Sequence, residues 1–426
     1  MKKITLSAVA VLSLAGGFSS ILSASDDFTL FSNSKINGEV KARYESVDVE
    51  NNGKMNANAY TVRLMLGLET TLLGVDGLTM KVDGTTVQTI GGTKYDNDPS
   101  PTLGDARYQV VADPEQTRFT QGYLQYKYGG TTAKVGRQLV NLDAQRFIGS
   151  VDWRQMPMSL DAVSVANTSI PGLNLFGAYM YGYDAIFDRP TQDSKSVILN
   201  ASYKVNEMLK ITAYDYMLSL ENFSAAANFA ADTYGLSLTG DLPAGPFKIS
   251  YHGEYAKQTD STFKKINSND KAQNDATYYN IEATASMLGV SLGAGQELLS
   301  GTSDEGMGTD GKTKFQTPLA TLHKFNGTAD MFLATPTGGL LDTYATVGYG
   351  AAGLGKALAT YHTFETDVAM GGKSDLGSEL DLQYSNAIPS VKGLNGLVKA
   401  AFYSGGDVTN YTKDKDILWI ELDYKF

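Results

Sequence analysis

The residue types that most often perform catalysis or bind metals are scarce in this chain and lie far apart. Its three histidines are His252, His323 and His362, and it contains no cysteine. No two histidines have the close spacing of metal ligands. Nucleophilic catalysis would need a histidine beside a serine or a carboxylate, and three dispersed histidines give little support for that arrangement. The glycine-rich pieces lack the strand–turn–helix context of a phosphate cradle. We therefore expect no catalytic residue, no metal and no cofactor, and we do not expect an enzyme.

Charged side chains instead recur at alternate positions within apolar segments. The last residues show the pattern best, because Leu418, Ile420, Leu422, Tyr424 and Phe426 alternate with Trp419, Glu421, Asp423 and Lys425. Residues 36–44, 60–69, 247–255 and 379–384 repeat it. A period of two predicts a β-strand, whose successive side chains point to opposite faces. In an outer-membrane barrel, the apolar face contacts lipid and the polar face lines the lumen.

The charged residues on the predicted inner face form the candidate pore-lining set. In the early strands the basic members are Lys41, Arg43, Arg63, Lys81, Lys127 and Lys134, against Glu39, Glu45, Glu69 and Asp83. In the later strands acidic residues outnumber basic ones, and the candidates there are Glu379, Asp381, Glu421 and Asp423. A wall that is basic on one side and acidic on the other would create a transverse field that selects solutes by charge.

Two stretches mix basic side chains, aromatic residues and carboxylates more than solubility alone requires. They lie within residues 134–162 and 323–342. One interpretation is that these loops fold into the barrel and aim Arg137, Arg146, Arg154 and Lys324 at the solute path. The alternative is a self-packed outer loop whose Arg–Asp pairs hold its own shape. We favour inward folding, because long loops otherwise tend to be mobile.

These same stretches resemble a known family. The runs GRQ, RFIG, DWRQ and DA in residues 134–162, and HKFNGTADMFL, TP and GLLDTY in residues 323–344, are similar to those of alginate-export-type outer-membrane proteins, a porin-like group. The resemblance implies a monomeric barrel of eighteen strands with a basic lumen that attracts anionic polysaccharide. The acidic later strands depart from that pattern, since a conduit for a polyanion should be basic all round. The departure favours small polar solutes.

The whole chain fits one up-and-down antiparallel transmembrane β-barrel. We expect about eighteen strands, near 35–45, 59–71, 77–89, 118–129, 131–140, 159–168, 172–182, 194–204, 208–219, 231–241, 246–258, 276–286, 288–298, 340–350, 355–365, 376–386, 395–404 and 415–426. Segments 159–168 and 208–219 alternate poorly, so sixteen strands stay open. Short periplasmic turns alternate with long extracellular loops, among them 90–117, 141–158, 220–230, 299–339 and 366–375, which is the asymmetry of bacterial outer-membrane barrels. Every strand in hydrocarbon must pair on both edges, so the sheet must close.

The N-terminus reads as a secretory signal. Lys2 and Lys3 precede an apolar stretch to Phe18, and small residues end at Ala24, where we place the cleavage site. An uncleaved anchor is the alternative, but the apolar stretch is shorter than the roughly 20 residues of a spanning helix. We therefore divide the chain into a signal peptide, 1–24, and an outer-membrane barrel domain, 25–426.

The net charge of the chain and its C-terminal strand indicate which partners to expect. The formal net charge of −11 becomes −13 once Lys2 and Lys3 leave with the signal, which argues against nucleic acid as a partner. The expected partners are outer-membrane lipid and lipopolysaccharide, small hydrophilic solutes, and the outer-membrane assembly machinery, which would read the last strand ending in Phe426. We expect a monomer, and a trimer stays open.

Together these features predict a porin, that is, a passive diffusion channel for small polar or charged solutes whose lumen is narrowed by inward-folded loops. Two alternatives remain. The chain could export an anionic, alginate-like exopolysaccharide as part of a secretion machine. It could also be a structural or adhesive barrel whose lumen is filled by its own loops and conducts nothing.

Overall fold

The computed structural model describes residues 30–92, 94–99, 104–224, 227–262, 275–302 and 313–426. The predicted signal peptide, 1–24, lies outside these residues. The strands are β1 (Phe31–Val49), β2 (Ala57–Leu72), β3 (Leu78–Thr89), β4 (Gln116–Tyr128), β5 (Thr131–Gln138), β6 (Ser159–Asn167), β7 (Leu173–Asp184), β8 (Gln192–Asn206), β9 (Leu209–Ser224), β10 (Ala227–Ala244), β11 (Phe247–Thr259), β12 (Asp275–Met287), β13 (Val290–Ser300), β14 (Gly339–Ala351), β15 (Gly355–Met370), β16 (Lys373–Ala387), β17 (Leu394–Ser404) and β18 (Lys415–Lys425). Among the residues that the structure describes, the loops contain one 3-10 turn, Leu322–Lys324. Over the described ranges, no helix is long and apolar enough to cross a membrane.

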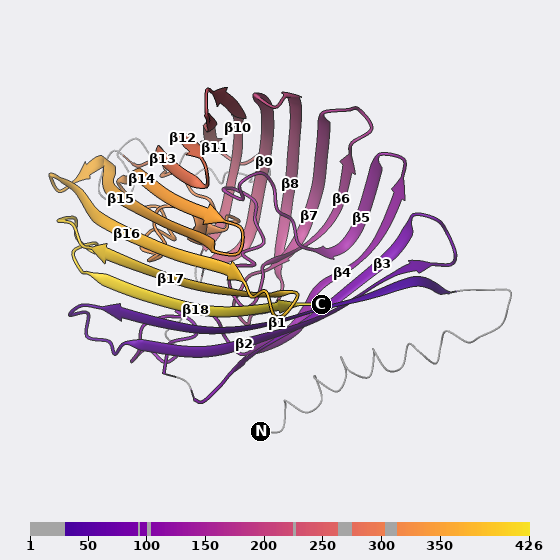
Figure 1. Cartoon of the computed structure of the whole chain (residues 1–426), viewed down its shortest axis with the longest axis horizontal. Coiled ribbons are helices and arrows are strands. Elements are labelled where there is room, and N and C mark those ends of the chain that lie inside the picture. Colours follow the sequence, from indigo (N-terminus) through magenta and orange to yellow (C-terminus); the bar gives the residue numbers. More distant parts are fainter. Residues whose placement is uncertain (1–29, 93, 100–103, 225–226, 263–274, 303–312) are drawn as a thin grey trace, which may run out of the picture.

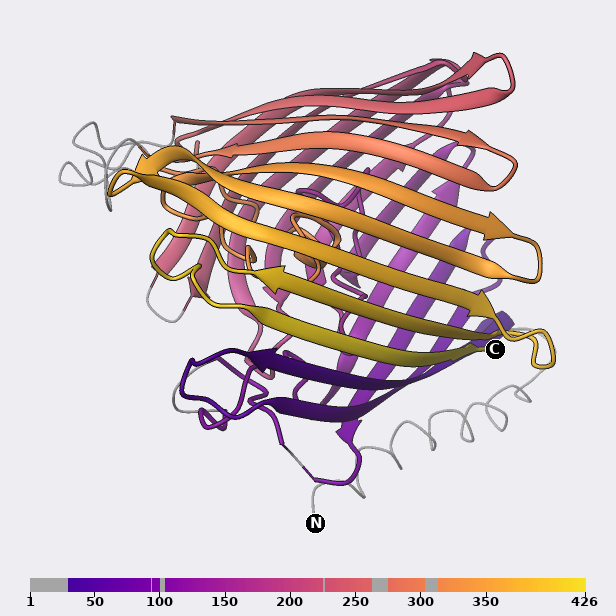
Figure 2. The ribbon, with the colours of Figure 1, turned by 60° about the vertical axis from the view of Figure 1, so that its left-hand side comes forward.

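The strands form one closed antiparallel sheet. Each strand pairs with its neighbours in the sequence, and β1 pairs with both β2 and β18. The closing register runs from Glu39 opposite Lys425 to Val49 opposite Lys415. Figures 1 and 2 show the strands arranged side by side around a lumen, with β1 next to β18. The predicted eighteen-stranded up-and-down barrel is confirmed, and the sixteen-stranded option is not.

Side-chain burial is inverted relative to a water-soluble protein. On β1, Ile36 is 62% exposed, whereas Glu39 and Arg43 are only 2% and 3% exposed. The last strand shows the same order, because Ile420 is 46% exposed and Glu421 is 9% exposed. Apolar side chains therefore face outward and charged side chains face the lumen, as a barrel wall in a bilayer requires.

The two segments with poor alternation form strands β6 and β9, and β9 has an apolar inner face. On β9, Tyr214, Tyr216 and Leu218 point into the barrel and are almost completely buried. Tyr214 and Tyr216 pack against Phe147, which comes from a loop inside the lumen. Alternation fades because both faces of the strand contact apolar material, lipid on one side and the loop on the other.

The asymmetry between the barrel ends is confirmed, but two expected long loops are wrong. Residues 366–375 belong mostly to β15 and β16, which are joined by a tight hairpin with Gly371 and Gly372 at positive φ. Residues 220–230 likewise belong mostly to β9 and β10. Neither segment keeps a regular alternation of apolar and polar residues, so the period of two did not identify these strand ends.

Candidate functional site

Two loops fold into the lumen. We call residues 139–158, between β5 and β6, the first inward loop, and residues 313–338, before β14, the second inward loop. Ile148 of the first forms an isolated β-bridge with Leu319 of the second, and both side chains are 1% exposed. Figure 2 shows loop segments within the ring of strands. The predicted inward folding is confirmed.

Two arginines attach the first inward loop to separate strands of the wall, β1 and β13. Arg154 binds Glu45 of β1 at 2.9 Å and also reaches Asp330 of the second inward loop at 3.0 Å. Arg146 binds Glu297 of β13 at 2.7 Å. Both arginines are buried. They therefore anchor the loop instead of facing an open path, so the predicted orientation toward the solute is wrong for these two residues.

The basic residues of β1 and β2 are also paired. Arg43 lies 2.6 Å from Glu421 of β18, and Arg63 contacts Glu39 as well as Asp152, the latter at 2.7 Å. Because the barrel closes β1 against β18, the basic and acidic sets meet on adjacent strands. At this seam the opposite charges lie side by side and neutralise each other, so these residues do not contribute to a transverse field between opposite walls.

The second inward loop is held by backbone amides. The N–H groups of Thr328 and Ala329 donate to Asp381 at 3.1 Å and to Glu379 at 2.7 Å, both on β16. Gly327 makes this approach possible, because its φ is +78° and a Cβ there would lie 2.5 Å from a Glu379 oxygen. These two predicted lumen carboxylates therefore accept hydrogen bonds from the second inward loop.

An aromatic and cationic cluster joins both loops to the seam between β1 and β18. The Trp153 ring stacks on His323 at 4.0 Å, and the Trp419 ring packs edge-on against both. Lys399 Nζ lies 2.9 Å from His323 Nε2, and His323 Nδ1 lies 2.8 Å from Asp330. Burial lowers the pKa of His323 to about 3, against the opposing effect of Asp330. The ring is therefore neutral, accepts a hydrogen bond from Lys399 and donates one to Asp330.

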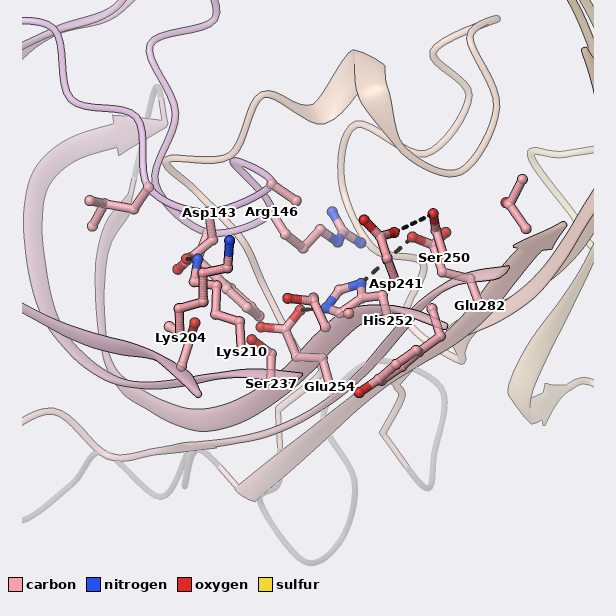
Figure 3. Close-up of a pocket in the computed structure, with 18 of the residues that line it drawn as sticks. Asp143, Arg146, Lys204, Lys210, Ser237, Asp241, Ser250, His252, Glu254 and Glu282 are labelled. Atoms are coloured by element: carbon pink, nitrogen blue, oxygen red, sulfur yellow. Dashed lines mark hydrogen bonds and ion pairs between the residues drawn. The ribbon is translucent and has the colours of Figure 1, made fainter. Parts of the chain in front are cut away.

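We call the lumen face of β1, β2 and β16–β18, covered by the two inward loops, the packed sector. The lumen face of β8–β12 differs from it, and we call it the open sector. A cavity of about 600 Å³ lies there between the wall and the first inward loop. Lys204 and Lys210 lie at one side of it with Asp143, while His252, Glu254 and Glu282 lie at the other (Figure 3).

The remaining predicted residues lie elsewhere on the wall. Arg137 is on β5, where it pairs with Asp161 at 2.8 Å and contacts Asp184. Lys41 lies 3.8 Å from Glu39, Lys81 lies 3.2 Å from Asp83, and Asp423 lies 3.2 Å from Lys425. Lys134 lies 4.6 Å from the centre of the Tyr123 ring. Lys127 and Lys324 are exposed.

Sequence reasoning did not select the residues of the open sector as a set. Lys204 and Lys210 precede and follow a turn, and Asp143 lies in a loop, so no short motif joins them. Strand register could have identified the lysines, because each neighbours an outward apolar residue, Tyr203 or Ile211. The alternation of residues 247–255 places His252 on the inner face, but its carboxylate neighbours come from two strands, and only the pairing of β11 with β12 brings them together.

Comparison with known proteins identifies the fold. No protein-family profile matches the chain, and no curated protein sequence matches it. Among solved structures, OpdK of Pseudomonas aeruginosa with vanillate gives a TM-score of 0.70 at 13% identity over 92% of this chain and 98% of that one. OccAB4 of Acinetobacter baumannii gives 0.68 at 14% over 93% and 98%. OccK9 (OpdG) of P. aeruginosa gives 0.71 at 16% over 92% and 98%. These likenesses show that the chain shares the barrel fold of those structures, and they give no support to the alginate-export-type family.

Proposed function

We propose that the protein is a passive outer-membrane channel for small polar or charged solutes. The observation that carries this proposal is a closed barrel with an apolar outer face, a charged inner face, and a polar cavity between the first inward loop and β8–β12. Such a wall offers a hydrated route whose width and charge select the solute.

The contents of the lumen favour small solutes over a polymer. The first inward loop contacts β1 through Arg154 and β13 through Arg146, so it crosses the lumen. A polysaccharide chain would have to displace this anchored loop. The similar OpdK structure was solved with vanillate, a small molecule, which is consistent with the size of solute we propose here.

The outer surface supports the proposed location and assembly. Phe426 pairs through its backbone with Gly38 of β1, at 2.9 and 3.0 Å, and its ring is 58% exposed. We propose that this terminal aromatic strand is the one read by the assembly machinery, after removal of residues 1–24. Lipid and lipopolysaccharide would cover the outward apolar residues of a monomer.

Conductance of purified protein in planar bilayers tests the proposal. We expect discrete current steps, and comparable protein that has been heated and not refolded should give none. Refolded protein that runs as a compact barrel on a gel and yet gives no current above background would contradict a channel. That result would favour the non-conducting barrel, which the two loops inside the lumen make a specific second candidate.

A further inference from the structure

The open-sector cavity carries negative charge that its own basic groups do not balance. Most charged groups around it have a partner of opposite sign. Lys204 binds Glu207 at 2.7 Å, Lys210 lies 3.7 Å from Asp143, and Asp241 lies 2.9 Å from Lys248. Arg146, in the roof, is held by Glu297. These pairs leave little net charge behind.

Glu254 and Glu282 are the exception. They share one partner, His252, whose Nε2 lies 3.3 Å from Glu254 and whose Nδ1 lies 3.7 Å from Glu282. Within the part of the chain that the structure describes, neither carboxylate forms an ion pair with a lysine or an arginine. With a charged imidazole, the three groups keep one excess negative charge, and with a neutral imidazole they keep two. Glu282 is 43% exposed to the cavity.

Neighbouring hydroxyl groups fix the two carboxylates in place. Tyr214 of β9 donates to Glu254 at 2.8 Å, and Tyr344 of β14 donates to Glu282. Each carboxylate accepts a hydrogen bond from a tyrosine through one oxygen. Its other oxygen points toward His252 (Figure 3). The cluster is therefore preorganised, which lowers the entropic cost of binding a cation there.

The roof of the cavity favours an organic cation over a metal ion. Leu142, Phe147 and Ile148 of the first inward loop line this cavity, and the Phe147 ring lies 5.3 Å from the ring of Tyr214, which contacts Glu254. Apolar side chains suit the hydrocarbon part of a solute and do not replace the water shell of a metal ion. No group of three or more ligands among the described residues could hold a metal.

We propose that Glu254 and Glu282, with their shared counter-ion His252, form a binding subsite for a small organic cation with an ammonium or guanidinium group. The cation would lie between the two carboxylates and the apolar roof, displacing the imidazole from one of them. This subsite rests on the proposed channel for its role in transport, because it would concentrate such cations within the lumen.

Ligand-observed NMR on the intact, detergent-folded barrel tests the subsite independently of transport. The probe is methylguanidinium, and methylurea is its neutral counterpart of the same shape. We expect saturation transfer to methylguanidinium and none to methylurea. The Glu254→Gln/Glu282→Gln variant keeps the tyrosine hydrogen bonds and should weaken binding by about tenfold or more, since bonds between charged groups are lost.

Two further variants sharpen the test. His252→Gln removes the competing imidazole and should strengthen methylguanidinium binding. Lys204→Gln/Glu207→Gln removes two charges of the same cavity without changing its net charge and should leave binding within about twofold, as expected for an exposed pair.

The outcomes separate the subsite from the channel. Equal saturation transfer to methylguanidinium and methylurea overturns the subsite, and so does binding that survives the double glutamate substitution in a correctly folded barrel. Charge-dependent binding without any bilayer current keeps the subsite and overturns the channel. Bilayer current together with charge-independent binding keeps the channel and overturns the subsite.

Discussion

The packed and open sectors of one lumen use charge in opposite ways. In the packed sector, Arg154 and Glu45 are sealed between loop and wall, with side chains 9% and 2% exposed. In the open sector, Lys248 and Asp241 form an equally short pair with side chains 58% and 41% exposed. The two pairs are equally short, so burial and not distance distinguishes the structural ion pair from the solute-facing one. Removing one partner of the buried pair leaves the other charge without water or a counter-ion, whereas water solvates the remaining charge of the exposed pair.

The largest expected effect comes from breaking the packed sector at Arg154. Arg154→Met leaves Glu45 and Asp330 buried without their cation, and we expect a loss of about 3–5 kcal/mol in the free energy of unfolding. Urea titration of the barrel in lipid vesicles measures it. A loss close to zero would show that the two sectors do not differ in the way described.

The second largest expected effect comes from Gly327, beside the backbone amides that attach the second inward loop to β16. Gly327→Ala places a Cβ against Glu379 and puts an alanine at a positive φ. We expect a loss in the free energy of unfolding from the strained backbone, and faster cleavage by protease because the clash displaces the second inward loop. Gly353→Ala is the matched control, because its φ is +76° and nothing lies within 4 Å of the added Cβ. The control should lose only about 1–2 kcal/mol, the cost of the left-handed backbone. Equal losses in both variants would exclude the clash with Glu379.

A pH dependence follows from His323 in the packed sector. Its pKa in the folded barrel, about 3, lies below the usual value near 6.5. Between these values the unfolded chain binds a proton that the folded chain does not, so stability should be full above pH 6.5 and fall toward pH 3. Thermal unfolding of wild type and His323→Gln measures the difference. The variant should lose less stability on acidification, and identical slopes would contradict the assignment.

The smallest effect should come from the open sector. Lys248→Met removes one partner of the exposed pair with Asp241, and water replaces it, so we expect no measurable change in unfolding free energy. Any change should appear in the reversal potential across a salt gradient, shifted toward cations. A destabilisation comparable to that of Arg154→Met would erase the contrast between the sectors.

The sequence predicted the strands because a bilayer wall imposes a simple period. All eighteen predicted segments overlap observed strands, including β6 and β9, whose alternation is weak. Errors arose at strand ends, as in residues 366–375, because the sequence there keeps no regular alternation of apolar and polar residues.

The site was harder to predict because it depends on pairing across the lumen. Periodicity placed Arg43 and Glu421 on the inner face, but only closure of the barrel makes them neighbours. Periodicity also could not show that Glu45 would bind an arginine from a loop. A loop that folds into the lumen has no regular repeat in its sequence from which its contacts could be predicted. The same limit applies to Glu254 and Glu282, whose shared histidine follows from the register of β11 and β12.

The contact between Trp153 and Trp419 also gives the protein an internal reporter of its own maturation. These are the only tryptophans in the chain, and their ring centroids are 5.9 Å apart. One comes from the first inward loop and the other from the last strand to be synthesised. The pair therefore joins the first inward loop to β18, a contact that no single hairpin contains. Indole fluorescence during refolding should accordingly follow completion of the barrel and not the formation of individual hairpins.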